Sequence, residues 1–301
     1  TILKKEHYEI AGALQRSFTE IVFHLLDIAK KKGGRSNKIV IAGGAAMNCV
    51  FNGLLDKNKI YDQNFVPPWP DDLGVSIGAT YLENNNLNKS NSKNVQVYLG
   101  PSYDNKEILS LLNKYKLKFK KPKKISSYIA KKISDGYLIG WFQDRMEFTH
   151  RALGNRSILA DPRKFEMQKK VNSAVKYRES FRPFAPATIE EKAPEIFDMD
   201  KKTKIPFMEK AVLVKKNWRK KIPAVVHVDG TARVQTINKN FNKKFYNLIN
   251  EFYKITDVPV LLNTSFNLNG EPIVMSPSDA IRTFHTCGLD ILVLQDYVIE
   301  K

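Results

Sequence analysis

The chain has 301 residues, which predicts two domains, and its 43% hydrophobic and 11% aromatic residues are enough for packed cores. No apolar run approaches the length of a membrane span and no signal peptide opens the sequence, so we expect no membrane partner. The two cysteines, Cys49 and Cys287, give no disulfide framework and favour a cytoplasmic location. The net charge of +18 suggests anionic partners. Because lysine runs are usually solvated faces, the charge carries little weight as a sign of nucleic-acid binding.

The first part of the chain predicts a helix, a strand and a second helix around a glycine pair. Residues 6–32 carry apolar side chains at helical spacing and end at Gly33-Gly34, as expected of an amphipathic helix. Residues 38–42 predict a short buried strand, after which Gly43-Gly44 turns into the next helix. A strand, a glycine pair and a helix N-terminus together can bind an anion or a nucleotide. Two glycines alone are a weak signal, because a tight turn needs them anyway.

Asp71 and Asp72 precede a third expected helix. They could simply cap it, or one of them could face a metal or a phosphate across a cleft. Residues 84–94 are almost entirely Asn, Ser, Lys and Leu and predict a linker, which divides the chain into domains 1–94 and 95–301. The mixture of elements predicts an α/β or α+β fold in both parts. In the second part we expect helices near residues 105–113, 126–134, 164–174, 242–253 and 277–286, and strands over residues 137–142, 185–189, 211–214, 233–236, 258–263, 291–294 and 297–299.

A basic segment, residues 144–163, follows the buried strand that ends at Phe142. It contains four arginines among Gly, Asn and Ser residues, and guanidinium groups beside such residues suit phosphate binding. The segment is too polar for a protein core by composition. A solvated loop with surface salt bridges is an equally good explanation of this segment taken alone.

Three further polar segments accompany it. Residues 175–186 place Lys176, Arg178 and Arg182 ahead of prolines that fix the backbone. Residues 227–236 contain a turn, and Arg233 and Gln235 are expected on one face of the strand that follows. Residues 262–267 lie at the end of the strand expected over residues 258–263, where ligands of open α/β sheets bind. Each segment alone could be a plain turn, an exposed strand face or a weak surface ion pair. Together they favour one oxyanion-binding pocket suited to phosphoryl or nucleotidyl chemistry.

These segments resemble the O-carbamoyltransferases of the nodulation and antibiotic-tailoring type. The resemblance runs from about residue 7 to residue 294, and its longer motifs are specific. The matching segments are residues 145–148, 151–163 (RALGNRSILADPR), 176–186, 229–235 (DGTARVQ), 263–267 and 270–274, together with residues 43–48 (GGAAMN) and 72–74 of the first part.

The resemblance implies an α/β fold in two domains. Residues 1–94 would be the C-terminal lobe of a Kae1-like domain with the actin-like ATPase fold, and residues 95–301 a YrdC-like twisted-sheet domain. The YrdC-like domain would activate carbamoyl phosphate with ATP and Mg²⁺, giving carbamoyl-adenylate, pyrophosphate and phosphate. The Kae1-like domain would pass the carbamoyl group to a hydroxyl of a sugar or natural product. It would use Fe²⁺ or a similar divalent metal held by two His and one Asp, matched here by Asp72.

The resemblance also implies roles for particular residues. The implied catalytic residues, listed below, are cationic and would offset the repulsion between the two polyanions, carbamoyl phosphate and ATP, when they are bound next to each other. Asn263 and Ser265 would orient carbamoyl or phosphate oxygens. The implied catalytic residues are Arg151, Lys176, Arg182 and Arg233, and the implied substrate or nucleotide ligands are Arg145, Glu147, Asn155, Ser157, Arg178, Gln235, Asn263 and Ser265, with Gly43, Gly44 and Asn48 in the first part.

The sequence departs from the family pattern in two places. Thr149-His150 stands where the family usually has Gly-Pro. The front half of the Kae1-like domain, with both metal-binding His, is absent, so we expect a fragment or a subunit whose partner chain supplies that lobe. Adenylate formation is expected without it, and complete transfer is not. Two alternatives remain open: a protein of tRNA threonylcarbamoyladenosine-type modification, and a non-catalytic nucleotide-binding subunit.

Overall fold

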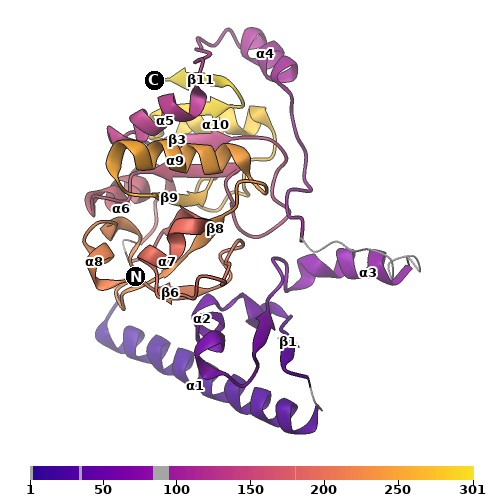
Figure 1. Cartoon of the computed structure of the whole chain (residues 1–301). Coiled ribbons are helices and arrows are strands. Elements are labelled where there is room, and N and C mark those ends of the chain that lie inside the picture. The colour runs from indigo at the N-terminus through magenta and orange to yellow at the C-terminus, as the bar shows by residue number, and fades with distance from the viewer. Residues whose placement is uncertain (1–2, 34–35, 84–94, 180) are drawn as a thin grey trace.

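The computed structural model describes residues 3–33, 36–83, 95–179 and 181–301. Two groups of elements are visible in Figure 1, which we call the N-terminal unit (residues 3–83) and the C-terminal unit (residues 95–301). The expected linker, residues 84–94, lies outside the described residues. No helix in the described ranges is long and apolar enough to cross a membrane.

The N-terminal unit packs helices around a two-stranded parallel sheet. Its small core joins Leu26 of the first helix to Phe51 and Leu55 of the second, with Ala46 and Val66. The first helix lies along this sheet, and α3 extends to the side, away from the large sheet (Figure 1). The elements are α1 (Lys5–Lys32), β1 (Lys38–Val40), η1 (Gly44–Met47), α2 (Cys49–Asn58), β2 (Gln63–Phe65), η2 (Asp72–Gly74) and α3 (Val75–Glu83).

The strand β1 differs from its prediction as a buried strand. Among the described strands it pairs with β2 alone, and Val40 is 67% exposed while Ile39 is half-buried. Apolar residues of α1 are exposed in the same unit, among them Ile10 and Leu14. The apolar side chains of residues 38–42 predicted a buried strand, but composition alone does not show how many strands and helices pack against it.

The C-terminal unit is built on a seven-stranded sheet in the order β11-β10-β3-β4-β9-β5-β8. The pairs β10–β3 and β5–β8 are parallel, and the other pairs are antiparallel. The elements are α4 (Asn105–Lys114), α5 (Ile125–Ser134), β3 (Ile139–Phe142), β4 (Arg156–Ala160), α6 (Glu166–Val171), η4 (Asn172–Lys176), β5 (Ala185–Ile189), η5 (Glu190–Lys192), α7 (Ala193–Ile196), β6 (Ala211–Leu213), α8 (Lys216–Arg219), η6 (Pro223–Val225), β7 (Thr231–Arg233), β8 (Gln235–Ile237), α9 (Lys243–Thr256), β9 (Val260–Ser265), α10 (Pro277–Thr286), β10 (Ile291–Leu294) and β11 (Tyr297–Glu300).

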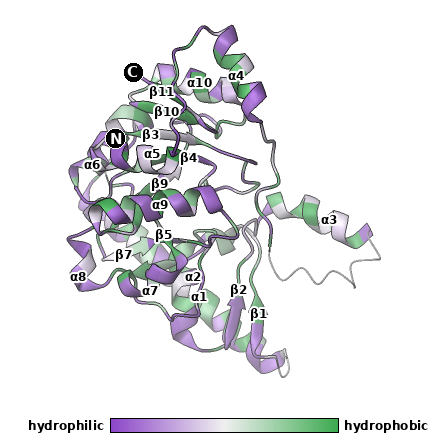
Figure 2. Cartoon of the chain, turned by 45° about the horizontal axis from the view of Figure 1, so that its top comes forward, coloured by the Kyte–Doolittle hydropathy of each residue, from purple (hydrophilic) through white to green (hydrophobic). Residues whose placement is uncertain are grey.

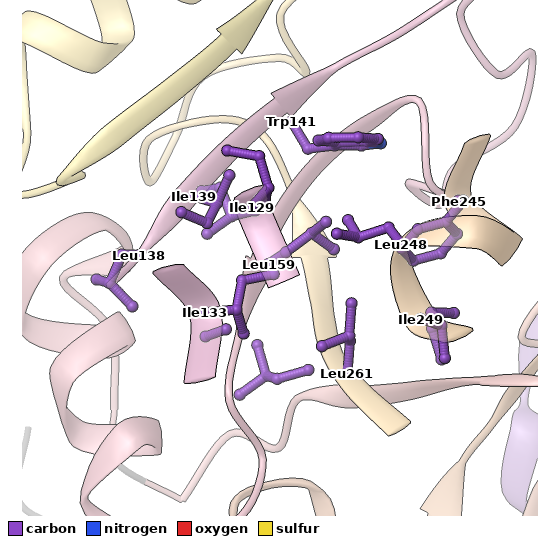
Figure 3. Packing of buried hydrophobic residues seen from close by; sticks show 14 of the residues in the cluster. Ile129, Ile133, Leu138, Ile139, Trp141, Leu159, Phe245, Leu248, Ile249 and Leu261 are labelled. Atoms are coloured by element: carbon purple, nitrogen blue, oxygen red, sulfur yellow. The ribbon is translucent and has the colours of Figure 1, made fainter. Parts of the chain in front are cut away.

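Helices α5 and α9 cover one face of the sheet. Ile129 and Ile133 of α5 and Leu248 of α9 meet Leu159 and Leu261 of the central strands (Figure 3). The apolar side chains of α9 follow helical spacing, so one stripe faces the sheet and the polar remainder faces solvent (Figure 2). This burial stabilises the sheet whose strand ends carry the loops described below.

The fold confirms a mixed α/β architecture and corrects two local predictions. Residues 156–160, expected in a polar non-core segment, form the fully buried strand β4 in the middle of the sheet. The strand expected over residues 233–236 is divided at Val234. Arg233 therefore ends β7, which pairs with β6 in a separate small sheet, whereas Gln235 begins β8 of the large sheet.

Candidate active site

A polar pocket of about 110 Å³ lies where β9 ends and β5 begins. The register of these antiparallel strands places Ala185, the first residue of β5, opposite Asn263 of β9. Loops before β4 and β5 and the end of β7 complete the wall. We call it the basic pocket, and it is lined by His150, Arg151, Ala152, Arg178, Pro183, Phe184, Ala185, Met208, Arg233, Asn263, Thr264 and Ser265.

Three arginines from different segments face this pocket. Burial, and secondarily the neighbouring Arg233, lower the pKa of Arg151 to about 10. Burial also lowers the pKa of Arg178, with further contributions from Arg182 and Arg233. Nε of Arg233 is buried and has no hydrogen-bond partner among the described residues. Partly desolvated, mutually repelling cations with an unpaired donor are an arrangement that a bound polyanion would stabilise.

An amide network holds the floor of the pocket. Nδ2 of Asn263 donates to the Ala152 carbonyl at 3.1 Å and to Oε1 of Gln235 at 2.9 Å. Gln235 Nε2 in turn donates to the Leu153 carbonyl at 2.9 Å. Oδ1 of Asn263 is buried and has no hydrogen-bond partner within the part of the chain that the structure describes. Gln235 therefore positions Asn263 from behind the pocket, and Asn263 keeps one acceptor free for a ligand.

Lys176 lies directly beside this wall. Its Nζ donates to the carbonyl and Oγ of Ser265 at 2.6 and 3.1 Å, and to the carbonyl and Oδ1 of Asn267 at 3.0 and 2.8 Å. Burial, and secondarily Arg178, lower the pKa of Lys176 to about 7. Its charge can therefore change near neutral pH.

Arg182 occupies an adjoining pocket rather than the wall of the first. That pocket, of about 210 Å³, is lined by Tyr177, Arg178, Glu179, Arg182 and Asn269. Nε of Arg182 pairs with Oε2 of Glu179 at 2.9 Å, and both side chains are about half exposed. Arg178 lines both pockets and so connects Arg182 to the site.

Glu147, Asn155 and Ser157 build the turn that presents Arg151. Oε1 of Glu147 accepts backbone hydrogen bonds from Leu153 at 2.7 Å and from Asn155 at 2.6 Å, and Ser157 Oγ accepts one from Gly154 at 3.1 Å. All three polar side chains are buried. Their expected role as ligands stays a prediction, since the contacts described here are with the protein.

The glycine of this turn is required by its surroundings. Gly154 has φ of +103°, and a Cβ there would lie 2.2 Å from the Phe245 ring. Only glycine fits both conditions.

The arginines of residues 144–163 point to different places. Arg156 is fully buried, lies 3.6 Å from the centroid of the Phe142 ring and donates to the Gln143 carbonyl at 2.6 Å. Arg163 forms a bidentate pair with Asp161, donating from Nε to Oδ1 and from Nη2 to Oδ2. Arg145 donates to the Leu99 carbonyl and lines a different pocket, which also contains Asn155. Of the four, only Arg151 lines the basic pocket.

The candidates of the N-terminal unit lie outside the pocket lining. Gly43 has φ of +99°, and a Cβ at Gly43 or Gly44 would meet nothing within 4 Å. Asn48 accepts from the Phe51 amide at 3.1 Å and donates to Gln15 at 2.9 Å, so it caps α2 and ties it to α1. Asp72 is exposed at the start of η2. Within the described residues, no group of three or more His, Cys, Asp or Glu side chains could hold a metal.

His150 was not expected in the site, and it joins the two units. Its Nε2 lies 2.8 Å from Oδ2 of Asp71, and this contact lowers the pKa of the Asp71 carboxyl. His150, Arg151 and Met208 line both the basic pocket and a small junction pocket, whose other residues include Ala46, Pro67 and Glu209. Only the unusual Thr149-His150 pair signalled this position in the sequence.

The mixed sheet and the three arginines that line one pocket define an α/β protein with a cationic pocket. Comparison with known proteins gives the family. Residues 130–301 match the family described as Carbamoyltransferase C-terminus, and residues 2–81 match Carbamoyltransferase N-terminus. The chain therefore belongs to the carbamoyltransferase family, which confirms the resemblance found in the sequence.

Several curated proteins are similar to nearly the whole chain. Nodulation protein NolO of Bradyrhizobium diazoefficiens is 42% identical over 99% of this chain and 55% of its own length. Nodulation protein NolNO of Sinorhizobium fredii is 41% identical over 99% of this chain and 44% of its own. The uncharacterized protein sll1178 of Synechocystis sp. is 35% identical over 99% and 53%. The chain thus spans about half the length of these relatives.

Proposed function

We propose that this chain carries the activating half of an O-carbamoyltransferase, which joins carbamoyl phosphate and ATP into carbamoyl-adenylate. One observation carries the proposal: Arg151, Arg178 and Arg233 line a single pocket with Asn263 and Ser265. Membership of the carbamoyltransferase family supports a carbamoyl group as the group that is activated. The arginines of the pocket offer positive charges that could bind the phosphates.

The reaction balances when one water takes part. Water first releases phosphate from carbamoyl phosphate and leaves carbamate. A carbamate oxygen then attacks the α-phosphorus of ATP, the bond to the β-phosphate oxygen breaks, and pyrophosphate leaves. The protein would hold both anions against their repulsion and orient the carbamate.

Individual residues would divide this work. The three pocket arginines would bind phosphate oxygens, with Arg182 reaching the same ligand from the adjoining pocket. The amide of Asn263 would orient the carbamate. Because the described residues that line the pocket include no Asp or Glu, Mg²⁺ would bind through the phosphates of ATP and water.

The second step would transfer the carbamoyl group to a hydroxyl of a sugar or natural product. The hydroxyl oxygen would attack the carbamoyl carbon and lose its proton to solvent, and the bond from that carbon to the adenylate oxygen would break, so that AMP leaves. We assign this step to the complete protein, because the matched relatives are about twice as long. Asp72 alone does not make a site for Fe²⁺ or a similar metal, so the remaining ligands would come from a further lobe, in the same or a partner chain.

Pyrophosphate release by the purified chain tests the activating step. With ATP and Mg²⁺, release should depend on added carbamoyl phosphate and occur without a hydroxyl acceptor. ATP-dependent binding without release would instead identify a nucleotide-binding subunit. A tRNA shift that persists at physiological salt would favour the tRNA-modification alternative, since phosphate-driven binding weakens steeply with salt.

A further inference from the structure

The N-terminal unit contacts the C-terminal unit at the residue that precedes Arg151. Nε2 of His150 lies 2.9 Å from Oδ1 and 2.8 Å from Oδ2 of Asp71, the residue just before η2. Arg151 itself lines both the basic pocket and the junction pocket. A contact made by the N-terminal unit is therefore one residue away from a cation of the proposed anion site.

The backbone of Arg151 is held by Thr149 on its N-terminal side. Oγ1 of Thr149 donates to the Arg151 carbonyl at 2.8 Å and accepts from the Arg151 amide at 3.0 Å. Within the described residues, the hydrogen bonds of Arg151 are those of its backbone. The place of the guanidinium therefore depends on the segment of backbone that carries it.

Both of these contacts come from the Thr149-His150 pair, which stands where the family usually has Gly-Pro. Neither glycine nor proline has a side chain that can donate or accept a hydrogen bond. The hydroxyl of Thr149 and the imidazole of His150 thus add two contacts that a Gly-Pro pair cannot make.

Asp71 is itself held within the N-terminal unit. The amide of Gly43 donates to the carbonyl of Pro70 at 2.5 Å, and the carbonyl of Asp71 accepts from the amide of Gly74 at 2.9 Å. These backbone contacts lie on both sides of the Asp71 side chain. Its carboxylate is therefore a fixed anchor for the imidazole of His150.

The N-terminal unit also contacts a second segment of the basic pocket. Nζ of Lys210 pairs with Oδ1 and Oδ2 of Asp56 at 2.9 and 2.8 Å, and Nδ2 of Asn52 donates to the carbonyl of Glu209 at 2.9 Å. Glu209 and Lys210 directly follow Met208, which lines the basic pocket. The N-terminal unit thus holds two separate segments that contribute to the pocket lining.

We propose that Asp71 and His150 are positioning residues for the activating step, and that through them the N-terminal unit sets the place of Arg151 in the basic pocket. The inference rests on the proposed function, because Arg151 would act in that step by binding phosphate oxygens. A partly exposed ion pair contributes little to stability, whereas a small displacement of a binding group weakens a site strongly. Loss of the pair should therefore affect anion binding more than folding.

Calorimetric titration of the purified chain with pyrophosphate tests this inference. In Asp71→Ala the affinity for pyrophosphate should fall by about tenfold. The sign of the change is informative, because removing a negative charge near an anion site would by itself strengthen anion binding. The matched control is Asp198→Ala, which removes the same charge from another ion pair between the units, 3.8 Å from Lys57 and outside the lining of the basic pocket. This control should not weaken binding.

Variants of His150 supply the second half of the test. His150→Ala should weaken pyrophosphate binding by about tenfold, whereas His150→Gln, whose side-chain amide can still donate to Asp71, should retain most of the affinity. When His150→Ala and Asp71→Ala are combined, the loss should be no greater than in His150→Ala alone, because both changes remove the same contact. Melting curves show whether each variant is folded at the temperature of the titration.

Two results would overturn the positioning role: an unchanged or higher affinity in folded Asp71→Ala, and additive losses in the combined variant. Carbamoyl-phosphate-dependent pyrophosphate release is measured on the same samples. Release by the wild-type protein with unchanged affinity in Asp71→Ala would reject the positioning role alone. Binding that depends on Asp71, without release, would support the positioning role and reject the activating function. A wild-type protein that does not bind pyrophosphate would contradict both.

Discussion

Lys176 Nζ donates a 2.6 Å hydrogen bond to the backbone carbonyl of Ser265 and thereby joins the end of η4 to the end of β9. Lys176→Met removes the cation at similar length. We expect pyrophosphate release to fall by about 100-fold or more, because a positive charge beside the reacting anions is lost. Lys169→Met, at an exposed position of α6, should have no effect. Melting curves would show whether Lys176→Met is folded at the assay temperature, and near-normal release by the folded variant would contradict the role.

The pKa of Lys176, lowered by burial to about 7, predicts that anion binding depends on pH. As the pH rises through this value, Lys176 loses its positive charge in the protein without ligand. A bound anion stabilises the protonated form of Lys176 and so raises its pKa. Pyrophosphate itself titrates in this range, so the comparison is made with Lys176→Met. Relative to that variant, the wild-type protein should lose affinity for pyrophosphate between pH 6 and pH 8.5, and it should take up additional protons on binding above about pH 7. Calorimetry in two buffers of different ionisation enthalpy measures this uptake. Equal uptake by Lys176→Met would assign it to another group.

Arg151 and Arg233 repel each other in the empty pocket, and burial and this repulsion lower the pKa of Arg151 to about 10. Arg151→Gln should therefore raise the free energy of unfolding in anion-free buffer by about 1 to 2 kcal/mol. Pyrophosphate should raise the melting temperature of the wild-type protein and have a much smaller effect on the variant. A variant less stable than the wild type without anions would show that Arg151 is held by favourable contacts instead.

Glu147 is expected to support the site through its turn. Glu147→Ala leaves the buried amides of Leu153 and Asn155 without an acceptor, and should lower the free energy of unfolding by about 3 kcal/mol. Glu147→Gln keeps an acceptor oxygen and should cost about 1 kcal/mol. Denaturant unfolding measures both. If Glu147 instead bound substrate, Glu147→Gln would lose pyrophosphate release with unchanged stability.

The long periodic or continuously apolar elements were predictable from sequence. Residues 185–189 and 277–286 were expected as β5 and α10 with the bounds that the structure has. Strand β4 was not, because Arg156 and Ser157 are polar. The burial of Arg156 depends on carbonyl groups of Gln143, Asp144 and Pro101, which only the folded chain brings around one guanidinium.

Arg151, Arg178 and Arg233 line one pocket, and their role in binding or catalysis stays a prediction. The contacts that support this pocket were not foreseen from the sequence. Gln235 was expected on the same strand face as Arg233, yet it lies in a different sheet and contacts Asn263. The link from His150 to Asp71 joins residues 79 positions apart. Residue patterns within a short window of sequence do not predict contacts between residues so far apart in the chain.

The wall of the pocket includes the hydrogen bond from Asn263 to the carbonyl of Ala152, and these two residues are 111 positions apart in the chain. During synthesis, the loop of Arg151 leaves the ribosome long before strand β9 exists. In the nascent chain, Arg151 is therefore present before the strand that completes the wall of its pocket. Assembly of the pocket should be a late event in the folding of the protein.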